Sequence, residues 1–159
     1  MPAAPGVKIR HATVDDVPAA ADLIVRTKRL NNEFDPFFAV VSDVKPKAER
    51  YVKESLGKSD RLLLVASVGS KVVGVVRAEI RERLFYEPSI EGFITDFYVL
   101  PEYRRKALGN QILQRASSEL KGMGAQLIVA EVPAQNEIAV RFYTKLKFRS
   151  IVQHFGTSR

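Results

Sequence analysis

The chain has 159 residues, of which 46% are hydrophobic, and these numbers suit a single domain with a substantial core. It contains no cysteine and only two histidines, which excludes a disulfide framework and a cysteine nucleophile and argues against a metal site. No apolar run is long enough to span a bilayer, so we expect a cytoplasmic protein that does not contact a membrane. The formal net charge of +7 makes the surface attractive to anions, of which nucleic acid is one example.

The first part of the sequence predicts one strand and two helices. Alternating apolar and polar residues predict a strand at residues 7–12. Apolar residues at helical spacing predict a helix over residues 14–30, with Thr13 as its N-cap. A segment rich in phenylalanine and proline, residues 31–46, separates this helix from a short second helix that ends at Gly57.

The rest of the sequence alternates between strands and helices. Residues 61–100 contain three strand-like runs, and a tight turn at Gly69 joins the first two as a hairpin. Thereafter we expect a helix, a buried strand, a second helix and a last strand, which cover residues 106–122, 126–132, 136–148 and 149–155. Asn136 is the expected N-cap of the second of these helices. This order predicts a mixed sheet with helices on its faces.

Three cations, Arg104, Arg105 and Lys106, stand where the helix over residues 106–122 is expected to begin. The amino end of a helix carries partial positive charge and unpaired N–H groups, so each cation there is unfavourable by about 0.3–1 kcal/mol. In a β-α-β unit this helix end lies at the carboxyl edge of the sheet, where α/β proteins bind ligands. A bound pyrophosphate would make the cations favourable; the alternative is a solvated turn whose charges are screened.

Two stretches of the sequence carry a family resemblance. "VLPEYRRKALG", which begins at Val99, resembles the acetyl-CoA signature of the GNAT (Gcn5-related N-acetyltransferase) superfamily. "NEIAVRFYTKLKF" resembles a second block of that family, and the matching residues are Asn136, Ala139, Phe142, Tyr143, Lys145 and Phe148. The blocks stand in the family's order, with one helix and one strand between them. The resemblance covers residues 92–150 well, and the amino-terminal half by the order of its elements only.

The resemblance implies a single N-acetyltransferase domain over residues 1–159. Its expected fold is α/β, with a mixed, mostly antiparallel twisted sheet of about six or seven strands, about four helices on its two faces, and a splay at the central parallel strand pair. The implied reaction transfers an acetyl group from acetyl-CoA to a primary amine by direct attack, without a metal. A non-catalytic acyl-CoA-binding relative is the main alternative, and a basic nucleic-acid-binding module has only the charge in its favour. Relatives often dimerise, and residues 149–155 could form the edge of a homodimer.

The resemblance also implies where acetyl-CoA binds. The pantetheine arm would lie in the gap between the splayed strands, the phosphates at the signature, and the thioester beside the second block. The residues implied for these parts are Phe97, Tyr98 and Val99 for the arm; Arg104, Arg105, Lys106, Ala107, Leu108, Gly109 and Asn110 for the phosphates; and Asn136 and Tyr143 for the thioester.

Two residues depart from the family pattern. Ala107 replaces the first glycine of the signature, where the absence of a Cβ lets the backbone approach the pyrophosphate. We therefore expect a slightly displaced cofactor. Lys147 replaces a glycine that normally gives a helix a left-handed end, so we expect this helix to end in a different shape.

Tyr143 is the implied acid that protonates the departing CoA sulfur, although an aromatic at this position could simply pack in the core. Acetyl transfer also requires a base or a water chain that takes up the proton of the amine. Glu131, in a stretch similar to the "E-V-x-x-x-N" of some family members, is the preferred base. Asp96 and an ordered water are alternatives, and either carboxylate could instead be solvated or paired with Arg77 or Arg81.

The segment between the first two helices covers the acceptor side in this family. Here Glu33, Phe34 and Asp35, together with Asp96, could frame a cationic amine with apolar walls. The alternative is that the phenylalanines of the segment fill the core beneath it. The candidate acceptors are a protein amino terminus, a lysine side chain, a polyamine and a small amino compound.

Overall fold

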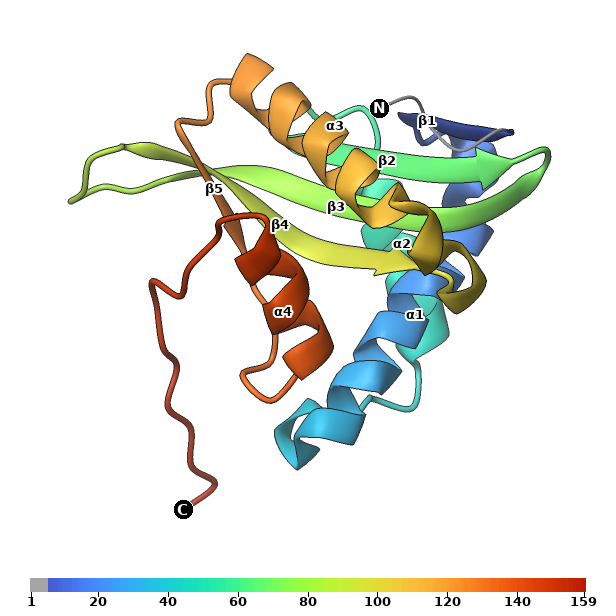
Figure 1. Ribbon diagram of the computed structural model, residues 1–159. Helices are drawn as coiled ribbons and strands as arrows, with labels where there is room; N and C mark the ends of the chain where they lie inside the picture. The colour runs from blue at the N-terminus through green and yellow to red at the C-terminus, as the bar shows by residue number, and fades with distance from the viewer. Residues whose placement is uncertain (1–5) are drawn as a thin grey trace.

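The computed structural model describes residues 6–159, except for the side chains of Arg105 and Lys106. In the described residues five strands form one sheet in the order β1-β2-β3-β4-β5, and four α-helices cover its faces (Figure 1). The strands are β1 (Val7–His11), β2 (Arg61–Val68), β3 (Lys71–Glu82), β4 (Ile90–Val99) and β5 (Leu127–Ala130). The helices are α1 (Val17–Phe34), α2 (Val44–Ser55), α3 (Leu108–Gly122) and α4 (Glu137–Lys145).

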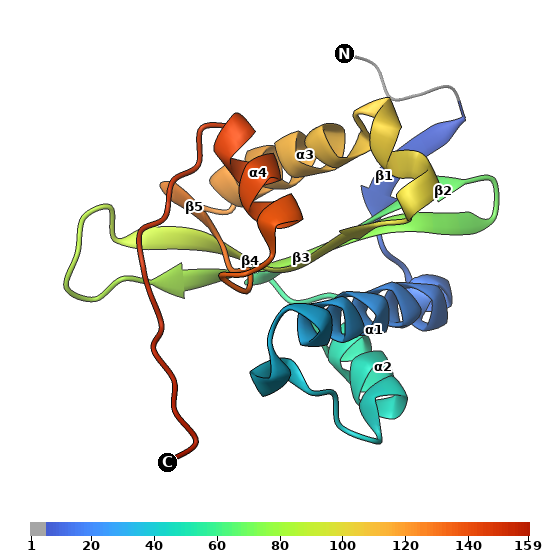
Figure 2. The ribbon, with the colours of Figure 1, turned by 60° about the horizontal axis from the view of Figure 1, so that its bottom comes forward.

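Helices α1 and α2 lie on one face of the sheet, and α3 and α4 lie on the other (Figure 2). The central strands β2 and β3 are therefore buried on both faces, which explains their nearly continuous apolar sequence. The α3 helix packs on the sheet through an apolar stripe, whose members Leu108, Ile112, Ala116 and Leu120 are all fully buried.

Strands β1 to β4 pair antiparallel, and β5 pairs parallel with β4. The predicted hairpin between β2 and β3 is confirmed, with Gly69 in a left-handed conformation (φ 59°). The parallel pairing ends where Ile94 lies opposite Ala130. Beyond this point residues 96–99 of β4 pair with β3 only, so the predicted splay of the central parallel pair is present.

The sheet has fewer strands than the six or seven expected. The predicted last strand at 149–155 is wrong, because residues 148–159 form no regular secondary structure and run along the molecule as an extended tail (Figure 1). Ile151, Val152 and Phe155 of this tail are exposed. A strand-like pattern forms a strand only when a partner edge is available, and the tail contacts the ring of Phe37 instead of the edge of β5.

The third helix starts two residues later than predicted. Pro101–Lys106 form a 3₁₀-helix, and α3 begins only at Leu108. The proline at the start of this segment fits a first helical turn, which does not need its missing N–H. The three cations of the signature therefore precede the helix instead of forming its first turn.

Candidate active site

Strand β4 contains a β-bulge at the point where it leaves β5. Ile94 lies opposite Ala78 of β3, and Asp96 lies opposite Arg77, so Thr95 is an extra residue in β4. The side chains of Thr95 and Asp96 consequently lie on the same face of the sheet, and both contact α2. A bulge of this kind shifts the two-residue alternation for all of the strand that follows.

Beyond the bulge, the backbone N–H and C=O groups of β4 consequently point to the opposite side from the one that regular alternation would give. Before it, the carbonyl of Ile94 accepts a hydrogen bond from the N–H of Glu131, on the β5 side (3.4 Å). After it, the N–H of Leu100 donates to a carbonyl of β3 (2.9 Å). Because neighbouring residues alternate in direction, the backbone groups of Phe97 and Val99 face away from β3. This open edge is where the pantetheine arm is predicted to lie.

The two motif blocks meet at this open edge. Phe142 of α4 stacks on Phe97 of β4, with ring centroids 5.6 Å apart and an interplanar angle of 26°. Gly109, in the first turn of α3, lies against both rings, since a Cβ there would be 3.3 Å from Cε2 of Phe142 and 3.8 Å from Cζ of Phe97. The glycine of the signature therefore leaves room for the stacked pair.

The amino end of α3 has N–H groups that find no acceptor inside the helix. Its N-cap residue, Ala107, supplies no capping side chain, and the N–H of Gln111 is the first to bond within the helix (to the carbonyl of Ala107, 3.2 Å). The N–H groups of Leu108, Gly109 and Asn110 precede it and have no acceptor within the helix. Such groups bind phosphate. The side chain of Leu108 is buried in the core, so it can contribute only its backbone.

Arg104 is engaged at the end of β4. Its Nε donates to the carbonyl of Val99 (2.8 Å), and its guanidinium lies 5.2 Å from the ring centroid of Tyr98. One of the two outward-facing carbonyls on the open edge is therefore occupied by a side chain of the signature itself. The side chains of Arg105 and Lys106, also predicted to bind phosphates, lie outside the described residues.

Both residues that replace family glycines keep a left-handed backbone: φ is 57° at Ala107 and 71° at Lys147. The expectation that α4 ends in a different shape is therefore wrong. The N–H of Phe148 bonds to the carbonyl of Tyr143 (3.0 Å), and the N–H of Lys147 bonds to that of Thr144 (3.1 Å). This is the bonding of a glycine-ended helix, and here it is formed at a conformational cost, because a side chain crowds the left-handed region.

Tyr143 is both a packed aromatic and a source of an available hydroxyl. Its ring is edge-on to those of Phe142 and Phe148, each with a centroid separation of 5.2 Å, and the residue is only 9% exposed. Within the described part of the chain its hydroxyl has no hydrogen-bond partner. Burial raises the pKa of Tyr143, so the phenol stays protonated at neutral pH.

The other two residues predicted near the thioester differ in exposure. Asn136 is buried and caps α4 as predicted, since its Oδ1 accepts from the N–H of Ala139 (3.1 Å). Its side-chain N–H₂ group and the second lone pair of its Oδ1 remain for a ligand. Glu131 is exposed and follows β5 directly, and its N–H makes the last backbone bond to β4 before the strands separate. Its carboxylate forms no ion pair among the described residues.

Asp96 is neither solvated nor paired with Arg77. It is 2% exposed; the hydroxyl of Tyr51 donates to its Oδ2 (2.6 Å). The ammonium of Lys28 lies 2.7 Å from its Oδ1 as an ion pair, without the geometry of a directed hydrogen bond. Burial, and then the charge of Asp96, raise the pKa of Tyr51. One oxygen of the Asp96 carboxylate is therefore hydrogen-bonded, and the other is held by an ion pair alone.

The predicted acceptor residues lie at the end of α1. Glu33 is exposed, and Phe34 is half-buried. Asp35 has a structural role, because its Oδ1 accepts from the N–H of Phe37 (2.9 Å) and caps a short 3₁₀-helix, Pro36–Phe38. Phe37 is 63% exposed, so this phenylalanine does not fill the core.

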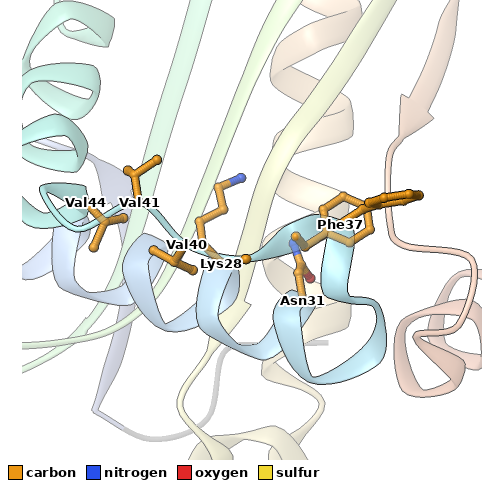
Figure 3. Close-up of a pocket in the computed structure, with 8 residues that line it drawn as sticks. Lys28, Asn31, Phe37, Val40, Val41 and Val44 are labelled. Atoms are coloured by element: carbon orange, nitrogen blue, oxygen red, sulfur yellow. The ribbon is translucent and has the colours of Figure 1, made fainter. Parts of the chain in front are cut away.

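A pocket of about 290 Å³ lies between α1 and the segment that leads into α2 (Figure 3). Phe37 stands at one end of the row of lining residues and Val44 at the other. The wall is mostly apolar, and the polar groups come from α1. The lining residues are Lys28, Asn31, Phe37, Phe38, Ala39, Val40, Val41 and Val44.

Sequence reasoning missed the polar cluster behind the bulge. Lys28 and Tyr51 were not predicted to have any role, and Arg77 was considered only as a partner for a carboxylate. No glycine or proline marks the bulge at Thr95 in the sequence. The one available signal was a group of charged and hydroxyl side chains within strands that are otherwise apolar.

Residues 27–148 match the model of the acetyltransferase (GNAT) family. The chain belongs to this family. It is 28% identical over 150 residues to an N-alpha-acetyltransferase of Saccharolobus solfataricus, with 90% of this chain and 80% of the relative covered. A second N-alpha-acetyltransferase, from Sulfurisphaera tokodaii, is 28% identical over 151 residues, with 91% and 81% covered.

A solved GNAT structure shows the same fold. The aminoglycoside N-acetyltransferase AAC(6')-Iy in complex with CoA superposes with a TM-score of 0.77, covering 100% of this chain and 98% of its own, at 15% identity. The predicted GNAT fold and N-acetyltransferase activity with acetyl-CoA as donor are thus confirmed. Among residues 6–159, no helix is long and apolar enough to cross a membrane, and no cluster of histidines and carboxylates could hold a metal ion.

Proposed function

We propose that this GNAT protein acetylates the amino termini of proteins or peptides. Its N-alpha-acetyltransferase relatives support this substrate class. So does the acceptor side of the fold, where the apolar pocket beside α1 could take the first side chain of a peptide. The observation that carries the proposal is the open edge of β4, where Gly109, Phe97 and Phe142 bring both motif blocks together.

A polycationic acceptor such as an aminoglycoside fits this chain less well. The structural neighbours that act on aminoglycosides share the fold at 15–19% identity. A net charge of +7 repels a polycation. Two of the predicted acceptor carboxylates are also engaged, since Asp35 caps a helix and Asp96 is paired with Lys28.

We assign the base to Glu131. In the reaction, the amine nitrogen forms a bond to the thioester carbonyl carbon, the carbon–sulfur bond breaks, and the amine loses one proton. Glu131 is exposed, forms no ion pair among the described residues and lies where the strands separate. Asp96 is the weaker candidate because Tyr51 and Lys28 engage both of its oxygens.

Tyr143 then acts on the leaving sulfur. Burial raises the pKa of this phenol above its ordinary value of about 10, whereas a free thiol has a pKa of about 8.5. A thiolate is therefore too weak a base to keep the proton of this phenol. We infer that Tyr143 stabilises the departing thiolate as a hydrogen-bond donor, and that the proton lost by the amine finally reaches the sulfur.

An acceptor panel tests the proposed function. Acetyl-CoA would be offered with a peptide that has a free amino terminus, with the same peptide blocked at its terminus but carrying a lysine, with a polyamine, and with an aminoglycoside. We expect CoA release and acetylation at the α-amine of the free peptide. Preferential acetylation of any other acceptor overturns the substrate class, and binding of acetyl-CoA without turnover of any amine supports the non-catalytic alternative.

Three further expectations stay predictions. The chain is expected to form one domain over residues 1–159, to work in the cytoplasm, and to be able to form a homodimer. Residues 149–155 remain the candidate segment for the dimer, since their apolar side chains are exposed in the single chain.

A further inference from the structure

Thr95, the extra residue of the bulge, is bound from two sides through its hydroxyl. The Oγ1 donates to the carbonyl of Arg77 across the strand pair (3.2 Å) and accepts from Nη1 of the same arginine (3.1 Å). It also lies 3.0 Å from the hydroxyl of Tyr51 on α2. Tyr51 gives its single proton to Asp96 at the shorter distance of 2.6 Å, and Thr95 gives its own to Arg77, so the two hydroxyls are in contact without a hydrogen bond between them. Arg77 connects them, because its Nη1 donates to Thr95 and its guanidinium lies over the ring of Tyr51.

Arg77 is itself held in place by α2. It is 6% exposed, its Nε donates to the hydroxyl of Ser55 (2.9 Å), and its guanidinium lies 4.4 Å from the ring centroid of Tyr51. Its Nη1 also donates to the carboxylate of Glu79. A buried, charged network of this kind is rigid only when each member keeps its partners. The cluster therefore fixes the bulge relative to both β3 and α2.

The place of the bulge decides which groups face the gap between β4 and β5. Regular pairing through Thr95 would turn the ring of Phe97 towards α1 and α2, and would turn its N–H and C=O towards β3. With the bulge, the ring stacks on Phe142 and the backbone groups face the open edge. The carbonyl of Val99 accepts from Arg104, so Val99 offers only its N–H at this edge, whereas Phe97 offers both its N–H and its carbonyl.

We propose that Tyr51, Arg77 and Thr95 are positioning residues for acetyl-CoA. Their side chains contact one another on the α1/α2 face of the sheet, and they act by holding the bulge that presents the backbone of Phe97 to the cofactor. The inference rests on the proposed function in one respect, namely that the cofactor occupies the gap. It assigns the α2 helix, which belongs to the acceptor side of the fold, a role in the affinity for the donor.

A matched pair of variants at Thr95 tests this role. Thr95→Val keeps the shape of the side chain and removes the hydroxyl, whereas Thr95→Ser keeps the hydroxyl. Titration calorimetry with CoA requires no knowledge of the acceptor. We expect Thr95→Val to weaken CoA binding about tenfold or more, because buried partners lose their hydrogen bond, and Thr95→Ser to bind within about twofold of the wild type. Tyr51→Phe should also weaken binding, and its effect should not add to that of Thr95→Val.

Two further measurements separate positioning from general damage. The KM for acetyl-CoA should rise in Thr95→Val while kcat at saturating donor stays within about twofold of the wild type, since the reacting groups are unchanged. The rate of amide hydrogen exchange at Phe97 should differ from that of the wild type in Thr95→Val, and should equal it in Thr95→Ser.

The outcomes are distinguishable from a failure of the proposed function. If the wild type does not bind CoA, the proposed function and this inference both fail. If the wild type binds CoA and folded Thr95→Val binds equally well, only the positioning role is overturned. If Thr95→Val does not fold, Tyr51→Phe decides, and equal binding by that variant overturns the role.

Discussion

Ala107 and Lys147 occupy left-handed positions without being glycine. At both sites another residue replaces the glycine of the family motif, yet the backbone conformation that glycine would provide is kept. The N-cap of α3 and the end of α4 therefore have the shape that the motif requires. The two substitutions change only the conformational free energy, because a side chain is unfavourable in the left-handed region. This cost does not argue for an inactive relative, because α3 still begins at Leu108 with first-turn N–H groups that have no acceptor within the helix.

Replacing either residue by glycine should stabilise the fold. We expect Ala107→Gly and Lys147→Gly each to raise the free energy of unfolding by about 0.5–1 kcal/mol, because relief of left-handed strain exceeds the added entropy of the unfolded chain. Urea denaturation measures this. Ala139→Gly is the control, since it lies in the right-handed helix α4 and should destabilise by about 1 kcal/mol. Equal destabilisation by all three substitutions would contradict the assignment.

Tyr143→Phe should separate catalysis from packing. The hydroxyl has no partner among the described residues, so its loss leaves no buried group unpaired, and the melting temperature should change little. We expect kcat to fall about 10²-fold or more if the phenol serves the leaving sulfur. Steady-state kinetics with saturating acetyl-CoA measures the effect. A kcat equal to that of the wild type would leave Tyr143 with a packing role only.

Sequence reasoning predicted residues whose roles are local. Asn136 was predicted to cap α4 because an N-cap depends on a few neighbouring positions. Asp96 was considered as a base, as a solvated carboxylate or as a partner of Arg77 or Arg81, and it is instead buried against Tyr51 and Lys28. Its environment depends on the bulge at Thr95 and on side chains from α1 and α2, which are distant in sequence, and no local pattern contains that information.

At the scale of elements, α3, α4 and β4 are joined through Gly109. A Cβ at this residue would be 3.3 Å from Phe142, so Gly109→Ala should move α4 away from β4. We expect a lower melting temperature and several-fold weaker CoA binding. Gly122→Ala in the last turn of the same helix is the matched control, because no atom lies within 4 Å of the added Cβ. It should be neutral or slightly stabilising.

The junction between β1 and α1 should be sensitive to acid. Asp16 is 6% exposed and accepts from Arg10 (2.7 Å) and from the N–H of Thr13 (2.7 Å). The hydrogen bond from Arg10 is the main cause of the lowered pKa of Asp16. A lowered pKa in the folded state stabilises the protein above the unfolded value of about 4, and this stabilisation is lost as the pH falls below it.

Asp16→Asn tests this junction. We expect a loss of about 1–3 kcal/mol at pH 7, and the difference from the wild type should shrink as the pH falls from about 5 to 2. Denaturation across this pH range measures it. Asp22→Asn is the control, because its pair with Arg26 is exposed and should contribute less than about 0.5 kcal/mol. A loss for Asp16→Asn that does not depend on pH would contradict the assignment.

The elements themselves were largely predictable, with one exception. Helices with regular apolar stripes and the hairpin at Gly69 were expected from patterns that the chain carries locally. The strand expected at 149–155 has a suitable local pattern but no partner. Strand formation depends on a neighbouring edge, and the sequence of this segment does not specify one.

For the whole molecule, a net charge of +7 should favour binding of a cofactor that carries phosphates. Acetyl-CoA at about 100 times its Kd should add about 2.7 kcal/mol of stability, which corresponds to a rise in Tm of about 5–10 °C. Thermal denaturation measures this shift, which should decrease at high salt.

The contribution of the signature cations to acetyl-CoA binding can be isolated by comparing two double variants that have the same net charge. Combined Arg105→Ala and Lys106→Ala lowers the net charge from +7 to +5 at the predicted phosphate site, and combined Lys53→Ala and Lys58→Ala does the same at exposed positions near α2. We expect only the first pair to reduce the shift markedly at a fixed concentration of acetyl-CoA. Equal losses would mean that the charge acts over the whole surface.

The bulge at Thr95 also makes β4 sensitive to whether an insertion or deletion before it contains an even or an odd number of residues. Adding or removing two residues between Ile90 and Ile94 would change the length of the strand but leave every later side chain on its present face. Adding or removing a single residue would exchange the two faces for the remainder of the strand, and would carry Phe97 away from Phe142. In this strand, insertions and deletions of even length are therefore the ones that a working cofactor site could tolerate.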